Sequence, residues 1–285
     1  MPEITRNANI EQAVESSKNS LAFLTLTTHE KERTIASHEI FKSTWQNNFS
    51  SPVEDLLNAG GAKVLDAGCH PAAPWLMDMA KEYRNCKFFG TDILPIPEPK
   101  NKPKNLNFYQ CDTLIGLPFE NNTFDFVYQK ILVSSFSVED WAKAINELIR
   151  VLKPGGYLEL MEFDDKFWNG GPEGDRWISY MHKLYEYKGI DPYIVYKLPS
   201  MLELTGRLSN IKHEEKRFYF GMPGRIGELI NSHYSRLFTS YKKPIVDFVD
   251  DLSYDDYDEM IEKVLEEFDE NHTSIKTGRV YGHKI

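Results

Sequence analysis

The chain has 285 residues, of which 41% are hydrophobic, 13% aromatic and 27% charged, and its formal net charge is −10. This composition is typical of a soluble globular protein with a sizeable core, and no apolar run reaches the roughly 20 residues that span a bilayer. Twelve carboxylates and one lysine fall within residues 247–270, so the remaining chain is nearly neutral and lacks the basic surface of a nucleic-acid binder.

The N-terminal sequence and the cysteines indicate the cytosol or the nucleus as the compartment. The start, MPEITRNANIEQ, lacks the basic and then apolar layout of a signal peptide. Cys69, Cys86 and Cys111 form an odd, sparse set without CxxC spacing. We therefore expect reduced thiols, with neither a disulfide framework nor a bound metal.

The first part of the chain changes from an aperiodic tail to alternating strands and helices. Residues 1–28 are polar and predict a flexible tail. Apolar residues at helical spacing predict a helix over 29–48 and a short helix over 53–57. The next expected strands are 63–69, 86–92, 106–112, 124–130 and 157–163, with helices over 72–83 and 138–152.

The later part of the chain is mainly helical. The remaining expected elements are helices over 175–187 and 193–205, a strand within 211–220, two helices within a late insertion over 223–272, and a strand over 279–282. Alternating strands and helices predict an α/β fold with a doubly wound, mostly parallel sheet and helices on both faces. Because we find no repeat and no clear linker, we expect a single domain over 29–285.

Polar residues end consecutive predicted strands, at Asp66 with Gly68, then at Asp92, Asp112 and Gln129. In a parallel sheet these positions converge on one crevice. Asp92 follows Asp66 by 26 residues, where a carboxylate can accept both hydroxyls of a ribose. Each acid alone is more typical of a residue that caps the next turn. The set in register favours a nucleotide-type site, at which Asp112 would accept from an adenine amine.

Four segments of the predicted sheet read VLDAGC, FFGTD, NFYQCDTLIGLPFENNTFDFVYQK and ELIRVLKPGGYLELMEF. They resemble the successive motifs of class I S-adenosylmethionine-dependent methyltransferases. The resemblance is closest to a fungal branch with secondary-metabolism and regulatory members, and it extends from about residue 29 to the ending VYGHK. It implies a seven-stranded Rossmann-like sheet, S-adenosyl-L-methionine as cofactor, and an N-terminal lid helix over 29–48.

The resemblance also implies which residues contact the methionine and ribose parts of the cofactor. Asp66 and the backbone of Gly68 would lie beside the methionine part. Asp92 would bind the ribose, and Ile93 would pack on the adenine.

The same resemblance implies contacts to the adenine edge from Asp112 and Thr113. Gln129 and Lys130 would line the floor near the methyl group. The lid helix would bring His38 and Trp45 near the cofactor or substrate, although a histidine and a tryptophan on an amphipathic helix are more often core residues than ligands.

The first loop departs from the family pattern D-x-G-x-G-x-G, because His70 and Ala72 replace two of the three glycines. If residue 70 keeps a positive φ, its backbone is strained by about 1 to 3 kcal/mol and its imidazole overlaps the site of the cofactor carboxylate. If Pro71 instead drives His70 into the extended region, the strain disappears and the imidazole can hydrogen-bond that carboxylate.

Methyl transfer from a sulfonium needs alignment and exclusion of water more than a covalent residue. A general base is required only if the acceptor must lose a proton. Candidates are Glu162, Asp164 and His182. The alternative interpretation makes the two acids solvated loop residues and His182 an ordinary residue on a helix face.

Aromatic residues suggest where the substrate would lie. The stretch 163–177 is rich in glycine, aromatic and charged residues, as a substrate-facing lid would be, but Phe167 and Trp168 are equally suited to filling the core. Tyr128 and Phe136 invite a contact with the sulfonium, or they face a helix layer. The methyl acceptor, a small molecule or a protein, is not identified by these features.

Two other functions compete with methyl transfer. The altered loop at His70 is consistent with a catalytically silent binding or regulatory protein that keeps the fold. A nicotinamide-dependent oxidoreductase is disfavoured, since the loop has no GxGxxG pattern.

The acidic segment predicts a helix with Ser253 as its N-cap. Its expected apolar stripe comprises Tyr254, Tyr257, Ile261, Val264, Leu265 and Phe268. The acids over 247–270 would then form its solvent face, and a basic partner on that face is the alternative.

Overall fold

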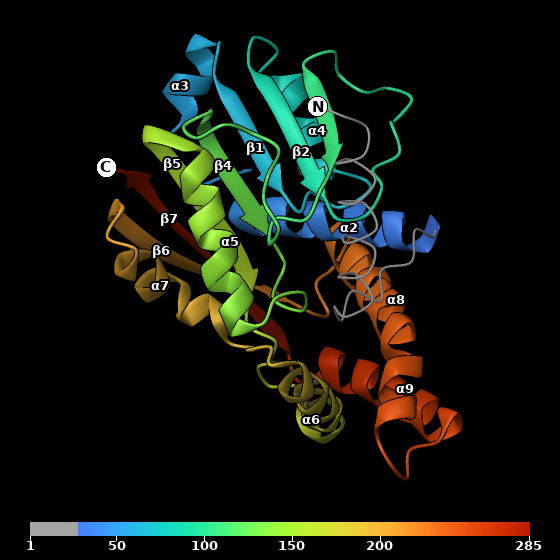
Figure 1. Cartoon of the computed structure of the whole chain (residues 1–285). Helices are drawn as coiled ribbons and strands as arrows, with labels where there is room; N and C mark the ends of the chain where they lie inside the picture. Colours follow the sequence, from blue (N-terminus) through green and yellow to red (C-terminus); the bar gives the residue numbers. More distant parts are fainter. Residues whose placement is uncertain (1–27) are drawn as a thin grey trace.

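The computed structural model describes residues 28–285, in which seven strands form one mixed sheet (Figure 1). The tail predicted over 1–28 lies outside the described residues except for its last position. The strands are β1 (Lys63–Ala67), β2 (Lys87–Asp92), β3 (Leu106–Gln110), β4 (Phe124–Lys130), β5 (Leu152–Phe163), β6 (Leu208–Tyr219) and β7 (Ser274–Lys284), in the sheet order β3-β2-β1-β4-β5-β7-β6. Strands β1 to β5 pair in parallel, whereas β7 is antiparallel to both β5 and β6, so the predicted mostly parallel sheet is confirmed.

The helices follow the predicted order with small changes at their ends. They are α2 (Thr28–Trp45), α3 (Glu54–Ala59), α4 (Pro74–Glu82), α5 (Val138–Val151), α6 (Gly171–Lys188), the 3-10 helix η1 (Ile194–Tyr196), α7 (Leu198–Leu204), α8 (Arg225–Phe248) and α9 (Tyr254–Glu270). The single helix predicted over 193–205 is wrong in detail, since it divides into η1 and α7. Pro199 lies in the first turn of α7, where a missing backbone N–H breaks no helical hydrogen bond. No described helix is long and apolar enough to cross a membrane.

Side chains alternate between the two faces of the central strands and build a core on each face. Val64 of β1 and Phe126 of β4 pack with α3 and α4, whereas their neighbours Leu65 and Val127 pack with α5 and α7. This period-two pattern follows from the pleat of a strand. It places helices on both faces of the sheet, as expected.

Strand β5 begins five residues earlier than predicted. Leu152 pairs with Phe124, and the register then shifts before Tyr157 pairs with Phe126. A tight turn lies inside this irregularity, because Gly155 has φ +76°, a conformation that glycine adopts without steric cost.

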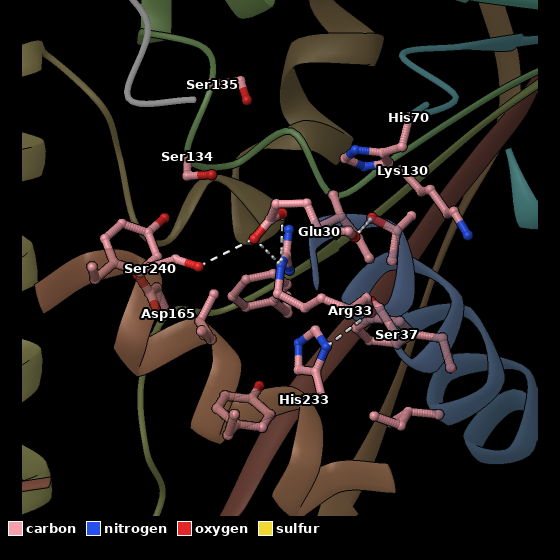
Figure 2. A pocket seen from close by; sticks show the side chains of 18 of the residues that line it. Glu30, Arg33, Ser37, His70, Lys130, Ser134, Ser135, Asp165, His233 and Ser240 are labelled. Atoms are coloured by element: carbon pink, nitrogen blue, oxygen red, sulfur yellow. Dashed lines mark hydrogen bonds and ion pairs between the residues drawn. The ribbon is translucent and has the colours of Figure 1, made fainter. Parts of the chain in front are cut away.

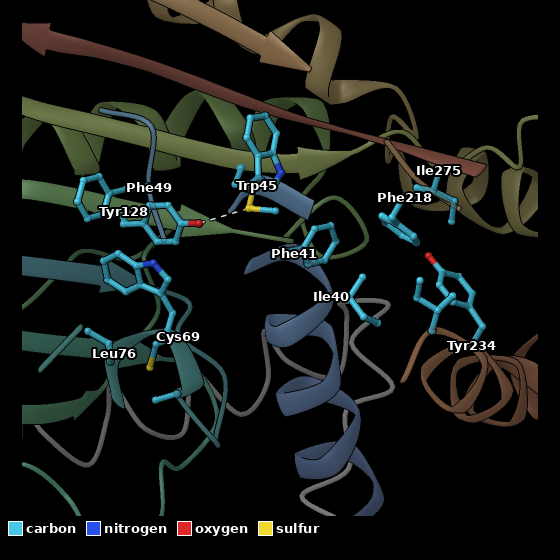
Figure 3. Packing of buried hydrophobic residues seen from close by; sticks show 14 of the residues in the cluster. Ile40, Phe41, Trp45, Phe49, Cys69, Leu76, Tyr128, Phe218, Tyr234 and Ile275 are labelled. Atoms are coloured by element: carbon cyan, nitrogen blue, oxygen red, sulfur yellow. Dashed lines mark hydrogen bonds between the residues drawn. The ribbon is translucent and has the colours of Figure 1, made fainter. Parts of the chain in front are cut away.

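Helix α2 crosses the carboxyl ends of β1, β2 and β4 (Figure 1). Except for Ile35, which is 46% exposed, its large apolar side chains face the core. The ring of Phe41 packs edge-on against Phe218 with 5.7 Å between centroids, and Ile40 is 1% exposed (Figure 3). The helix therefore covers the edge of the sheet at which the predicted ligand site lies.

Most of the acidic segment forms α9. Ser253 accepts a hydrogen bond from the backbone of Asp256, whose carboxylate accepts one in return from Ser253, which confirms the predicted cap. Tyr257, Val264 and Phe268 are buried, but Tyr254 is 44% exposed, so its place in the apolar stripe was wrong. Tyr254 is the first residue of the helix and contacts the end of α8 at the surface, where its ring lies 5.3 Å from Lys242 Nζ and its hydroxyl donates to Asp247 Oδ1 at 3.3 Å.

Candidate functional site

Two buried polar groups at the ends of adjacent strands lack hydrogen-bond partners among the described residues. They are the carboxylate of Asp66 on β1 and the side-chain amide of Gln129 on β4, both fully buried. Burial raises the pKa of Asp66 to about 7, against the opposing effect of the Lys130 charge. Because such groups are costly to bury without partners, this edge of the sheet is suited to a polar ligand that carries hydrogen-bond donors.

The loop that follows β1 holds three residues at positive φ before α4 begins, Gly68, His70 and Ala73. Gly68 has φ +75°, and a Cβ built there would lie 2.9 Å from Leu132 Cδ1. His70 has φ +61°, so the alternative in which Pro71 makes residue 70 extended is wrong. Its backbone N–H donates to Asp92 Oδ2 at 3.0 Å, and its carbonyl accepts from Ala73 N at 2.9 Å. These two bonds hold His70 in a region that a bulky residue seldom adopts.

The acids that end β2 and follow β3 both cap the turn that follows them. Asp92 accepts from His70 N and, through Oδ1, from Leu94 N at 2.9 Å, and Asp112 Oδ1 accepts from Leu114 N at 2.8 Å. This is the capping role that each acid alone was expected to have. A carboxylate oxygen can accept more than one hydrogen bond, so both acids keep capacity for a ligand hydroxyl or amine.

Two further residues of the predicted set flank these acids. Ile93 is half-buried next to Asp92, and its carbonyl accepts from Gln110 Nε2 at 3.0 Å. Thr113 is buried beside Asp112, with an exposed fraction of 8%. The structure therefore brings the expected ribose and adenine positions to one edge of the sheet.

Lys130 at the end of β4 is buried and connects to α2. Its Nζ lies 3.4 Å from His38 Nδ1, and His38 Nε2 lies 3.1 Å from Asp78 Oδ2 on α4. Burial lowers the pKa of His38 to about 4, so its ring is neutral at pH 7. The geometry then fixes one tautomer, in which Nε2–H donates to Asp78 and Nδ1 accepts from Lys130.

Trp45, the other residue predicted to lie near the ligand, is a core residue. It is 4% exposed, and its ring is flanked by Lys216 Nζ at 5.4 Å and Arg279 Cζ at 4.5 Å. It does not line the cavity between α2, α6 and α8.

A cavity of about 90 Å³ lies between α2, α6, α8 and the carboxyl ends of β4 and β5 (Figure 2). Of the predicted cofactor residues, His70 and Lys130 line it, whereas the acids at 66, 92 and 112 do not. Its polar lining comprises Glu30, Arg33, Thr34, Ser37, Ser134, Ser135, Asp165, His233 and Ser240, and its aromatic lining comprises Phe41, Phe163, Trp177, Tyr185, Phe218, Tyr234 and Tyr241. The cavity therefore adjoins the predicted cofactor site on the side of Lys130.

The two acids considered as general bases are buried structural residues, so the expectation of solvated loop acids was wrong. Glu162 accepts from the backbone N–H groups of Leu132 at 2.7 Å and Val133 at 3.0 Å, next to Ile131, which has φ +54°. Burial raises the pKa of Glu162 to about 8, although these amides oppose the shift. Asp164 accepts from Trp168 Nε1 and from the Tyr196 hydroxyl. Neither carboxylate lines the cavity.

The third candidate base, His182, is also outside the cavity lining. Its Nε2 lies 3.0 Å from the backbone oxygen of Asp165, and its ring is partly exposed. Its position supports the interpretation of an ordinary residue on a helix face.

The aromatic residues considered for sulfonium contact are packed in the core. Tyr128 stacks on Trp75 with centroids 4.2 Å apart and an interplanar angle of 10°, and Phe136 packs edge-on against Trp141. In the segment 163–177, Phe167 is 2% exposed and packs on Phe268. This segment is therefore largely a packed connection, of which Phe163 and Trp177 reach the cavity.

Sequence reasoning missed most of the cavity lining. Asp165 follows the candidate Asp164 directly, so a doubled acid after a strand was the available signal. Arg33, His233 and Tyr241 carried none, because they lie on α2 and α8, about 200 residues apart in the sequence, and only the folded chain brings them together.

Comparisons with known proteins agree with this architecture. A family model described as "Methyltransferase domain" matches residues 64–156. The chain is 26% identical over 150 residues to secondary metabolism regulator laeA of Coprinopsis cinerea, covering 52% of this chain and 37% of that protein. It is 28% identical over 159 residues to N-methyltransferase verN of Clonostachys rogersoniana, covering 54% of each. The chain thus spans about a third to a half of the length of these relatives.

A solved structure shows the same fold over most of the chain. It is phosphoethanolamine N-methyltransferase 2 of Haemonchus contortus in complex with phosphomonomethylethanolamine and S-adenosylhomocysteine, with a TM-score of 0.53 and 18% identity over 92% of this chain and 59% of that one. At this identity the likeness is one of fold. Residues 64–156 therefore match a methyltransferase domain within a methyltransferase-type fold, in a chain distantly similar to fungal laeA regulators and N-methyltransferases.

Proposed function

We propose that the protein binds S-adenosylmethionine across the carboxyl ends of β1, β2 and β4 and transfers its methyl group to an acceptor in the cavity beneath α2. The observation that carries this proposal is the buried carboxylate of Asp66, which has no hydrogen-bond partner among the described residues. A carboxylate of this kind fits the ammonium group of the methionine part, since that group supplies both charge and donors.

Different residues of the site would bind different parts of the cofactor. Asp66 and Gln129 would hold the methionine part, while the remaining acceptor capacity of Asp92 and Asp112 suits ribose hydroxyls and the adenine amine. When bound, the cofactor supplies a methyl group on a sulfonium and leaves as a neutral thioether. The chain's contribution is alignment and exclusion of water, for which α2 lies over the site.

Calorimetric titration with S-adenosylmethionine and with S-adenosylhomocysteine tests this proposal. We expect both ligands to bind, and Asp66→Asn to weaken binding about tenfold or more because a charged hydrogen bond is lost. Glu259→Gln, which removes an exposed carboxylate of α9, is the matched control and should bind as the natural protein does. Absence of binding heat for both ligands with the folded natural protein would overturn the proposal.

The second candidate function is a catalytically silent binding or regulatory protein. It is favoured by the left-handed backbone at His70 and Ala73, two residues other than glycine in the loop after β1. The double variant His70→Gly with Ala72→Gly separates the two functions. A large gain in cofactor affinity would indicate that the natural loop has lost binding, whereas unchanged or weaker binding supports the enzyme.

A further inference from the structure

Some charged side chains in the cavity beneath α2 are paired with an opposite charge, and others are not. Arg33 donates from Nε to both carboxylate oxygens of Glu30, at 3.0 and 3.2 Å, and Ser240 donates to the same carboxylate at 3.1 Å (Figure 2). Because Arg33 is committed to Glu30, its positive charge is already compensated. An anionic ligand would therefore find no ready partner there.

The other side chains of the lining that carry a basic nitrogen are His70, His233 and Lys130. None of them places a positive charge on the side of the cavity opposite Lys130 (Figure 2). Burial lowers the pKa of both His70 and His233 to about 3, so both rings are neutral at pH 7. Lys130 lies near Asp66 and His38.

Asp165 is the carboxylate on this opposite side. It is 9% exposed, and it forms no salt bridge within the described part of the chain. Tyr185, Tyr241 and Ser134 line the cavity together with this acid. Hydroxyl groups therefore share the cavity wall with the carboxylate.

The walls around Asp165 are aromatic. Trp177, Tyr185, Tyr234 and Tyr241 line the same cavity, and the faces of such rings attract a cation. A buried carboxylate with aromatic neighbours is suited to an ammonium ion, because the ion supplies the missing charge and its alkyl group contacts the rings. A carboxylate or phosphate would instead be repelled by Asp165.

We propose that the cavity between α2, α6 and α8 binds a small primary or secondary amine as the methyl acceptor, with Asp165 holding its nitrogen. This inference rests on the proposed methyl transfer. The Asp165 carboxylate would take one proton from the ammonium, leaving a nitrogen lone pair to form the bond to the methyl carbon. The carbon–sulfur bond breaks with its electron pair remaining on sulfur, and the methylated nitrogen carries the positive charge.

Ligand-observed NMR with three probes of one shape tests the binding step on the full chain. The probes are propylammonium, 1-propanol and propionate at pH 7. We expect propylammonium to bind about tenfold or more tightly than 1-propanol, since a charged hydrogen bond distinguishes them, and propionate not to bind. Equal binding of the amine and the alcohol would overturn the proposal without any variant.

The isosteric variant Asp165→Asn should abolish the preference for the amine, whereas Asp269→Asn, which neutralises an exposed acid of α9, should keep it. Circular dichroism reports whether each variant is folded, and a folded Asp165→Asn that retains the preference contradicts the proposal. Parallel titration with S-adenosylhomocysteine separates the proposed methyl transfer from the proposed amine site. Binding of S-adenosylhomocysteine without binding of the amine refutes the amine as acceptor and leaves the methyl transfer standing. Binding of the amine without S-adenosylhomocysteine refutes the methyl transfer and leaves the amine site standing.

Discussion

Lys130 Nζ lies 3.4 Å from His38 Nδ1, and this contact joins the end of β4 to the helix that covers it. The same imidazole reaches Asp78 on α4 through Nε2 at 3.1 Å. A neutral ring with one donor and one acceptor is the group that can bridge an ammonium and a carboxylate in this way. The position of α2 over the candidate site therefore depends on a polar contact as well as on its apolar face.

Replacing His38 with leucine should destabilise the protein by about 2 kcal/mol, because the buried Lys130 ammonium loses its acceptor on α2. The control is Lys42→Met, which removes a 2.6 Å ion pair to the same Asp78. Since Lys42 is 45% exposed, that pair should contribute less than about 1 kcal/mol. Urea unfolding measures both free energies. Equal losses in the two variants would contradict a special role for the buried bridge.

Two glycines with nearly the same φ separate backbone strain from crowding by a neighbouring side chain. Gly61 has φ +82°, and no atom lies within 4 Å of the position that a Cβ would take. Gly68 has φ +75°, and a Cβ at this residue would lie 2.9 Å from Leu132 Cδ1. Gly61→Ala should cost about 1 to 2 kcal/mol from the left-handed backbone alone. Gly68→Ala should cost about 1 to 3 kcal/mol more, from overpacking against Leu132. Equal free energies of unfolding for the two variants would show that Leu132 moves aside without cost.

The sheet was predictable from the sequence because its signals are local. Alternation and the apolar strands each depend on a few adjacent residues, and they placed Asp66 and Asp92 at one edge. The irregular start of β5 was missed, since the pairing of Leu152 with Phe124 depends on a register shift between two strands.

The chemistry of the site was less predictable because burial is not a local property. Glu162 and Asp164 look like loop acids in the sequence, yet each is fixed by backbone or side-chain donors from other segments. His70 takes the left-handed conformation because Asp92 accepts from its backbone, a contact that the order of residues did not reveal.

The pH dependence of stability should contain a contribution from His233 of α8. Its Nδ1 lies 3.2 Å from the carbonyl of Arg33, and burial lowers its pKa from 6.5 to about 3. Below pH 6.5 the unfolded chain therefore takes up a proton that the folded chain does not, so stability falls as the pH drops from about 6.5 towards 3. Over the two pH units from 6.5 to 4.5 this loss is about 2 to 3 kcal/mol.

His233→Asn keeps a donor for the Arg33 carbonyl and removes this titration. Denaturation at pH 6.5 and at pH 4.5 should show a loss that is smaller by about 2 to 3 kcal/mol in the variant than in the natural protein. His272→Asn, at an exposed position after α9, serves as the control. An identical pH slope in His233→Asn and the natural protein would count against the buried neutral imidazole.

One acid of α9 has a structural role that its neighbour lacks. The Glu267 carboxylate accepts from the backbone N–H groups of Glu173 and Gly174 at 3.0 Å, which lie in the first turn of α6, whereas Glu266 is exposed. A carboxylate at this position satisfies free donors at the positive end of the helix. Glu267→Ala should therefore lower the free energy of unfolding by about 1 to 2 kcal/mol, and Glu266→Ala should change it by less than about 0.5 kcal/mol. Both variants remove one negative charge from the same segment, so they differ only in the contact with α6. Thermal or urea unfolding measures the free energy of each variant. Equal free energies of unfolding would mean that charge repulsion within 247–270, and not the contact of Glu267, determines the stability of this segment. Glu267→Gln, which retains the acceptor oxygen, should recover part of the loss.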